Sequence, residues 1–341
     1  MRRASRSSCS LGGLAVTLTG CGPQSALWPA GPQAGRIATL WWLMFWTVTI
    51  VFVIVVAAAV GAVLRRGART RLPVTPDSMI DVGREHRMTV VVCAAVGVTA
   101  LILVVFLSAS AWTGRKLAEL VGRDPVTIEV TGHQWWWEVQ YDAPTPAGRV
   151  TTANEIHVPV GRRVLLKLES RDVIHSFWVP RLHGKMDLIP GQTNLLWIQA
   201  DQAGRYPGQC AEFCGYQHAH MRLLIIAEPV EQFDAWLVGQ RRSAAEPSNP
   251  LAARGRDVFL GGPCVLCHTI RGTDAGSRVG PDLTHLASRT TLAAGTLPNT
   301  PGHLAGWIVD AQGVKPGVRM PSISLPAEEL QAMLAYLGSL K

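Results

Sequence analysis

Two long stretches without a charged residue constrain the fold of this chain more than any other feature. No Asp, Glu, Lys or Arg occurs between Arg36 and Arg65, over 28 positions, or between Arg87 and Arg115, over 27 positions. About 20 apolar residues are enough for a helix to cross a bilayer, and a soluble core helix is rarely so long or so uniform. We therefore predict a two-helix transmembrane hairpin, with spans at 37–64 and 88–114 and a loop at 65–87.

The distribution of charge orients this hairpin. The formal net charge is +8, and residues 1–125 carry all of it, with 13 Lys and Arg against 5 Asp and Glu, whereas residues 126–341 have 19 of each. Arginines are concentrated in the 65–87 loop, so the positive-inside rule places this loop in the cytoplasm and both ends of the chain on the outer face. The excess charge therefore indicates membrane orientation, and we expect no nucleic-acid partner.

The first 20 residues read as an export signal, with three arginines within the first six residues followed by a short apolar stretch. The tetrad Leu18-Thr19-Gly20-Cys21 resembles the lipobox of bacterial lipoproteins, which implies that Cys21 is the acylated mature N-terminus. A plain signal peptide and an uncleaved leader are the alternatives.

The pattern changes after the second span. Residues 125–238 contain short runs of β-branched and aromatic residues separated by Gly and Pro, which predicts a β-sandwich or barrel. The runs are 126–130, 164–168, 195–199 and 223–227. A polar linker is expected at 239–250. Residues 251–341 read as helical, and Leu330, Met333, Leu334 and Leu337 share one face of the last helix. The fold class is thus a multidomain membrane protein.

Four soft or borderline metal donors lie within twelve residues of the β-rich region: Cys210, Cys214, His218 and Met221. Thiolate, imidazole and a weak axial thioether are typical of copper electron-transfer sites. The two cysteines could bridge a pair of metal ions, in which case a second imidazole must come from elsewhere. A disulfide or a zinc site is the alternative for the cysteines, but neither explains the accompanying Met221.

Upstream motifs make the pattern specific. The runs are Gly132-His-Gln-Trp, His175-Ser-Phe-Trp-Val-Pro, Gly184-Lys-Met-Asp, Pro190-Gly191 and Cys210-x-Glu-x-Cys-x-x-x-His-x-x-Met. Together with the two spans, they resemble the binuclear copper (CuA) domain of cytochrome c oxidase subunit II. The resemblance implies a cupredoxin-like β-sandwich.

The resemblance also implies roles for individual residues. Cys210 and Cys214 would bridge the two coppers, and His175 and His218 would bind one each. Met221 would be an axial ligand, and Glu212 would contribute its carbonyl to copper and its side chain to a magnesium site shared with subunit I. Trp135 would be the entry point for electrons. Because three consecutive tryptophans on a strand alternate between faces, at least one of residues 135–137 should face solvent.

A second cofactor motif stands near the C-terminus. Cys264-x-x-Cys267-His268 is the signature of covalent c-type haem attachment, with the histidine as the proximal iron ligand. The sixth ligand should be a later Met or His, and we expect Met320. Met333 lies on an apolar helix face and is expected in the core, while His285 and His303 are weaker alternatives. The segment resembles a class I cytochrome c, which implies an all-α cytochrome c domain at 251–341.

These resemblances imply subunit II of a bacterial haem-copper cytochrome c oxidase with a fused cytochrome c domain. The expected cofactors are the CuA pair, covalent haem c and possible interfacial magnesium. The implied partners are oxidase subunits I and III, and cytochrome c or a quinol:cytochrome c reductase as electron donor. Both soluble domains would lie outside the bacterial plasma membrane. The family also has a glutamate at the mouth of a proton-uptake channel, which suggests that role for Glu85; a solvated acid at a helix end is the alternative.

Three other functions are compatible with part of this pattern. A quinol oxidase subunit II shares the two spans but lacks the copper ligands present here. Nitrous oxide reductase has a similar copper loop but neither the two-span anchor nor a fused cytochrome c. A free-standing, membrane-tethered electron carrier has no catalytic partner, and co-purification with a large haem-binding subunit would discriminate it from an oxidase subunit.

Overall fold

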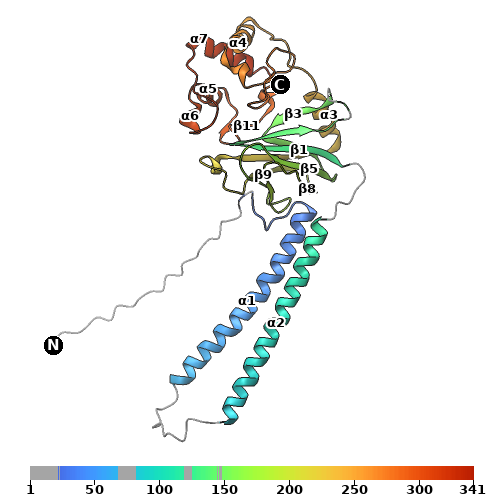
Figure 1. The fold of residues 1–341 in the computed structure, drawn as a ribbon, viewed down its shortest axis with the longest axis vertical. Helices are drawn as coiled ribbons and strands as arrows, with labels where there is room; N and C mark the ends of the chain where they lie inside the picture. Colours follow the sequence, from blue (N-terminus) through green and yellow to red (C-terminus); the bar gives the residue numbers. More distant parts are fainter. Residues whose placement is uncertain (1–21, 23, 68–81, 119–124, 144, 146–147) are drawn as a thin grey trace, which may run out of the picture.

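Two long antiparallel helices dominate the N-terminal part of the structure (Figure 1). α1 spans Pro32–Gly67 and α2 spans Val82–Ala118, and both are long and apolar enough to cross a membrane. The structure, a computed structural model, describes residues 22, 24–67, 82–118, 125–143, 145 and 148–341. The proposed export signal and Cys21 lie outside these residues.

A β-sandwich follows the two helices. Its first sheet has the order β3-β2-β1-β5-β8, and its second has the order β4-β10-β9-β6-β7. The strands of the first sheet are β1 (Val126–His133), β2 (Trp136–Tyr141), β3 (Val150–Ala153), β5 (Val164–Ser170) and β8 (Asn194–Ile198). Those of the second are β4 (Glu155–Pro159), β6 (His175–Trp178), β7 (Met186–Leu188), β9 (Gly204–Cys210) and β10 (Arg222–Glu228).

Alternating burial along the strands builds the core between the sheets. In β5, Val164, Leu166 and Leu168 are buried while the residues between them are partly exposed, as the period of two in a strand requires. Trp137 of β2 meets Phe177 of β6 edge to face, with ring centroids 5.9 Å apart, so this aromatic pair joins the two sheets. The expected cupredoxin-like β-sandwich is confirmed.

The C-terminal region is mainly helical. After α3 (Val230–Gln240) come α4 (Pro250–Gly261), α5 (Pro301–Val309), α6 (Ala311–Val314) and α7 (Ala327–Leu337). Short pieces complete it: the 3₁₀ turns η4 (Pro263–Leu266) and η5 (Leu286–Ser288), and a ribbon of β11 (Thr291–Leu292) and β12 (Leu297–Pro298). A Cβ on Gly255 of α4 would stand only 1.9 Å from the Ala332 carbonyl oxygen of α7, so glycine permits this close helix crossing.

The β-sandwich lies between the long helices and the C-terminal helices (Figure 1). On one side, Ala30 N donates to the Arg181 carbonyl at 2.8 Å, and Trp197 Nε1 donates to the Leu117 carbonyl at 2.9 Å. These bonds attach the start of α1 and the end of α2 to the sandwich. The C-terminal helices occupy the opposite side, so each soluble unit has a defined position relative to the spans.

Candidate functional site

The loop between β9 and β10 gathers the soft metal donors that the sequence predicted. Cys210 ends β9, η3 (His218–His220) carries the histidine, and Met221 directly precedes β10. Cys210 Sγ lies 3.7 Å from Cys214 Sγ, and Cys214 Sγ lies 3.6 Å from His218 Nδ1 and 3.8 Å from Met221 Sδ. A bond from Cys210 N to the Met221 carbonyl, 2.9 Å long, closes the loop at its base.

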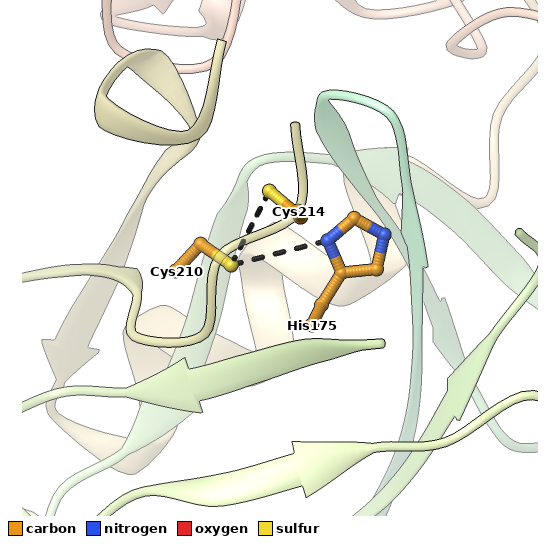
Figure 2. A group of neighbouring side chains, drawn as sticks. All are labelled: His175, Cys210 and Cys214. Atoms are coloured by element: carbon orange, nitrogen blue, oxygen red, sulfur yellow. Dashed lines mark hydrogen bonds between the residues drawn. The ribbon is translucent and has the colours of Figure 1, made fainter. Parts of the chain in front are cut away.

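The second histidine comes from the neighbouring strand. His175 begins β6, which pairs with β9, and its Nδ1 lies 3.9 Å from Cys210 Sγ. Figure 2 shows the imidazole beside the two sulfurs, which approach each other from the two ends of the loop segment. The donor atoms of His175, Cys210 and Cys214 all lie within 4.8 Å of one another, and all three residues are buried. Strand pairing therefore supplies the imidazole that local spacing could not.

Two residues hold the His175 ring in place. Asp172 Oδ1 accepts a 2.8 Å hydrogen bond from Nε2, which leaves Nδ1 facing the sulfurs. A Cβ on Gly132 would lie 2.8 Å from His175 Cδ2, so the absence of a side chain on β1 makes room for the ring. Carboxylates commonly orient metal-binding histidines in this way. Asp172 stands three residues before His175 in the sequence, but nothing in the sequence indicated that its carboxylate would orient the histidine ring.

The electrostatics of the cluster favour metal binding. The hydrogen bond with Cys214 lowers the pKa of the Cys210 thiol, against the opposing effect of burial. Burial lowers the pKa of His175, but the hydrogen bonds with Asp172 and Cys210 outweigh it and raise the pKa above its usual value. Two thiols, two imidazoles and a thioether sulfur are the donor types that copper prefers, so the residues present fit a copper pair.

Two further residues from the resemblance lie beside this cluster. The Glu212 carbonyl oxygen is 3.2 Å from Cys210 Sγ, while its carboxylate accepts a bond from Phe213 N at 3.1 Å. Trp135 Nε1 donates to the Cys214 carbonyl at 3.0 Å. The indole is thus bonded directly to the metal-binding loop.

The three tryptophans differ from the expectation. Trp135 lies in the turn between β1 and β2 instead of on a strand, and it is only 8% exposed, while Trp137 is fully buried. Trp136 is half-buried and stacks on His133 with ring centroids 4.4 Å apart. The expectation that one of them faces solvent freely is therefore wrong, because the C-terminal region covers this turn.

That covering region contains a cavity of about 290 Å³. Its walls include Cys264, Cys267, His268 and Met320, and on one side His133, Gln134, Trp135 and Trp136 of the β-sandwich. η4 holds Cys264 at the end of α4, and the Cys264 carbonyl accepts bonds from the amides of Cys267 and His268, at 3.2 and 3.0 Å. The turn thus places both thiols and the imidazole at one cavity.

The surroundings of the His268 ring suit an iron ligand. Its Nδ1 donates to the Pro281 carbonyl at 2.7 Å, which leaves Nε2 for a metal. Burial lowers the pKa of His268 and so favours the neutral ring that ligation requires. A Cβ on Gly280 would lie 2.8 Å from Cε1 of this ring, which repeats the glycine spacing found at His175. The residues present therefore fit a covalently attached haem.

The four candidates for the sixth ligand of the haem iron differ in their position relative to the cavity. Met320 lines the cavity and is partly exposed, whereas Met333 also lines it but is 1% exposed within the helical core. Both ring nitrogens of His285 contact carbonyls, of Lys341 at 2.8 Å and of Arg242 at 3.1 Å. His303 Nδ1 contacts Thr300 Oγ1 at the start of α5. Neither histidine is among the described residues that line the cavity.

Several polar contacts between the two soluble regions were not foreseen from the sequence. Glu138 binds Arg278, and Glu155 Oε1 accepts bonds from the amides of Thr290 and Thr291 at 2.8 and 3.2 Å. Lys315, which is 2% exposed, donates two bonds across the same boundary, to the carbonyls of Trp135 and His220, and a third to the Ala293 carbonyl of its own region. The partners in these contacts between regions are far apart in the sequence, and no local motif predicts the contacts.

Comparisons with known proteins agree with this geometry. A family model described as "Cytochrome C oxidase subunit II, periplasmic domain" matches residues 143–228, and one described as "Cytochrome c" matches residues 252–341. A cytochrome c oxidase subunit 2 of Alkalihalophilus pseudofirmus is 41% identical over 222 residues, covering 65% of this chain and 63% of that protein. One from a Bacillus species is 34% identical over 232 residues, covering 64% and 63%. The matches thus span a little under two thirds of these relatives.

One solved structure is similar in sequence to part of this chain. The periplasmic domain of subunit II of the cytochrome oxidase of Bradyrhizobium japonicum is 31% identical, covers 36% of this chain and 97% of that chain, and has a TM-score of 0.33.

Two membrane-spanning helices, a cupredoxin-like domain with a copper donor set and a cytochrome c domain define a membrane-anchored protein of electron transport. The chain therefore contains a cytochrome c oxidase subunit II periplasmic domain followed by a cytochrome c domain, and over its matched length it resembles bacterial cytochrome c oxidase subunits 2.

Proposed function

We propose that this chain accepts electrons through its fused c-type haem and delivers them, by way of the binuclear copper centre, to the catalytic subunit of a bacterial cytochrome c oxidase. That subunit would reduce oxygen to water and couple the reaction to proton translocation. The observation that carries the proposal is the common wall of the two sites: Trp135 lines the haem cavity and donates a hydrogen bond to Cys214 of the copper loop.

The proposed ligands divide between the two sites. Cys210, Cys214, His175, His218, Met221 and the Glu212 carbonyl would hold the two coppers. Cys264 and Cys267 hold the haem covalently, with His268 and Met320 on its iron. When bound, the copper pair and the haem would each supply a one-electron redox centre, and the residues that hold them would set these two centres on either side of Trp135. The residues around them exclude water and fix each imidazole, so that little has to rearrange when an electron arrives.

The position of the copper loop supports delivery towards the membrane. A groove of about 530 Å³ is lined by Ala34 and Ile37 of α1 together with Cys210 and His218. The loop therefore lies between the cytochrome c domain and the outer end of the first span. Subunit I of the oxidase is the partner expected at this groove, and subunit III completes the complex.

The remaining assignments follow from the same proposal. Both soluble domains face the outer side of the bacterial plasma membrane, where cytochrome c or a quinol:cytochrome c reductase donates electrons. Cys21 anchors the mature N-terminus to lipid, and the Glu212 side chain shares magnesium with subunit I. Glu85 is exposed in the first turn of α2, as a solvated acid at a helix end would be; a role in proton uptake is the alternative, and unchanged turnover in Glu85→Gln would remove it.

Substitution of one bridging thiol tests the copper assignment. The full chain, purified with copper and haem, should show a c-type reduced optical band and the electron paramagnetic resonance signal of a delocalised mixed-valence copper pair. In Cys210→Ser, the copper signal should disappear while the haem band remains. Persistence of both signals would show that Cys210 is not a ligand.

Association with the oxidase is tested separately. Purification of the full chain from its native membrane should bring along a large haem-binding integral subunit. A preparation that carries both centres and never contains such a subunit would favour the free-standing electron carrier.

A further inference from the structure

The turn before Met320 is bound to the copper loop by a buried lysine. Lys315 lies just after α6, and its side chain reaches out of the cytochrome c domain into the β-sandwich. Its Nζ donates to the Trp135 carbonyl at 2.8 Å, to the His220 carbonyl at 2.8 Å and to the Ala293 carbonyl at 3.0 Å. An ammonium group has three donors, and all three are used here.

Two of these three acceptors belong to the other domain. Trp135 lies in the turn between β1 and β2, and its indole donates a hydrogen bond to the copper loop. His220 directly precedes Met221 in that loop. Only Ala293 belongs to the cytochrome c domain. The bonds therefore connect domains, and a lysine that served only the local fold would bond mainly within its own region.

Neighbouring contacts reinforce the connection. Gln217 Nε2 donates to the Pro316 carbonyl at 2.8 Å, and a Cβ on Gly317 would lie 3.7 Å from the Trp135 ring, so this glycine packs against the indole. We call the segment 315–317, with these contacts, the clasp. The clasp lies a few residues before Met320 in the sequence. The chain segment that carries the proposed haem ligand is therefore bonded to the copper loop.

Because the Lys315 ammonium group is buried, it requires hydrogen-bond acceptors at fixed positions. Lys315 is 2% exposed, and burial lowers its pKa to about 7. A buried cation is strongly unfavourable unless its hydrogen bonds are satisfied, and here backbone carbonyls satisfy them. Because these carbonyls have the right geometry only when the domains are docked in this orientation, displacement of the domains would leave the charge without its partners.

From these contacts, and resting on the proposed function, we propose that Lys315 is a positioning residue that holds the haem-ligand loop against the copper loop and so fixes the path between the two centres. Lys315 also lines the haem cavity, but its three hydrogen bonds go to backbone carbonyls of residues that are not proposed ligands, so the clasp acts through the placement of the domains.

The test compares Lys315→Met with wild type, using the full chain with haem and copper bound. Methionine retains the length of the side chain but has no donor. Amide hydrogen exchange of segments 133–137 and 215–221 should become at least about tenfold faster, because hydrogen bonds to a charged donor are among the stronger ones. Exchange in α4 and α7 should not change. The exposed Lys341 provides a matched control, and Lys341→Met should leave all these segments unchanged.

A second measurement follows the domains themselves. Pulsed electron paramagnetic resonance between oxidised haem and the oxidised copper pair should give a narrow distance distribution in wild type and a broad one in Lys315→Met. A narrow distribution in the variant, or faster exchange throughout α4 and α7, would overturn the proposal. If Lys315→Met yields no haem-loaded protein, Gln217→Ala carries the same test, and unchanged exchange and distance there would overturn it equally.

The electron-transfer rate separates this proposal from the proposed function. After photochemical reduction of the haem, electron transfer to copper should be about tenfold slower in Lys315→Met, with unchanged optical bands. If wild type itself shows no such transfer, the proposed function fails, whereas the exchange and distance results still decide whether the clasp exists.

Discussion

Two of the three proposed ligand histidines, His175 and His268, each pack against a glycine, and this spacing leads to a paired prediction. An alanine Cβ at position 132 would lie 2.8 Å from Cδ2 and 3.1 Å from Cγ of His175, and one at position 280 would lie 2.8 Å from Cε1 and 3.1 Å from Nδ1 of His268. Carbon atoms pack favourably at about 3.5 to 4.0 Å, so each added methyl group stands roughly 0.7 Å too close.

The structure indicates which group must move in Gly132→Ala. Gly132 lies in β1, paired with Trp137 of β2 on one side and with Ser170 of β5 on the other, so the backbone is held by two strands. The His175 ring is fully buried and bonded to Asp172, yet it is the less constrained partner. Overpacking of this kind costs about 1 to 3 kcal/mol. If the ring absorbs it, copper affinity should fall roughly 5- to 150-fold.

The assay is a copper titration of the full chain against a competing chelator, read by electron paramagnetic resonance, with the haem optical band recorded in parallel. Gly132→Ala should weaken copper binding and leave the haem band unchanged, whereas Gly280→Ala should alter the haem band and leave copper binding unchanged. Gly239→Ala is the control, because its Cβ would meet nothing within 4 Å. Wild-type copper affinity in Gly132→Ala, or equal loss of both signals in both variants, would refute the reasoning.

Two further predictions concern the polar groups around the sites. Asp172→Asn retains the size of the side chain but weakens the acceptor for His175 Nε2, so copper affinity should fall roughly 10- to 100-fold in the same titration, and unchanged affinity would remove the positioning role of Asp172. Burial raises the pKa of Glu138, but hydrogen bonds from His133 and Arg278 outweigh it and lower the pKa from 4.5 to about 2. That difference corresponds to about 3 kcal/mol of stability, which we reduce to roughly 1 to 2 kcal/mol because Arg278 is 60% exposed to solvent. Since the folded-state pKa is lowered, the contribution is complete above pH 4.5 and is lost as the pH falls towards 2. The difference in thermal unfolding between wild type and Glu138→Gln should accordingly be constant from about pH 5 to 8 and shrink below that range, and a difference that grows at low pH would contradict this assignment.

The sequence predicted the parts of the molecule whose signals are local. The two uncharged runs define α1 and α2, and the donors at 210–221 lie in one loop, so spacing alone brings them together. The motif at 264–268 is equally local, because a single turn holds it. The contribution of His175 required the family resemblance, since its approach depends on the pairing of β6 with β9.

The sequence could not predict contacts between distant segments. Lys315 meets a carbonyl 180 positions away, and Glu155 meets amides 135 and 136 positions away. Lysine and glutamate are ordinary surface residues in most sequences, and nothing in their neighbours marks these two as buried. The error about the tryptophans has the same origin, because the burial of Trp135 depends on a domain more than a hundred residues later.

The polar character of the domain boundary has a consequence for electron transfer. An apolar boundary of similar extent would tolerate several docking angles, because hydrophobic contact has little directionality. Buried charges are satisfied in few orientations, since each misplaced donor or acceptor is left without a partner. Lys315 and Glu155 therefore select one docking geometry, and in that geometry Trp135 lies between the haem cavity and the copper loop. A fused domain already has a high local concentration, so what these buried charges add is orientation.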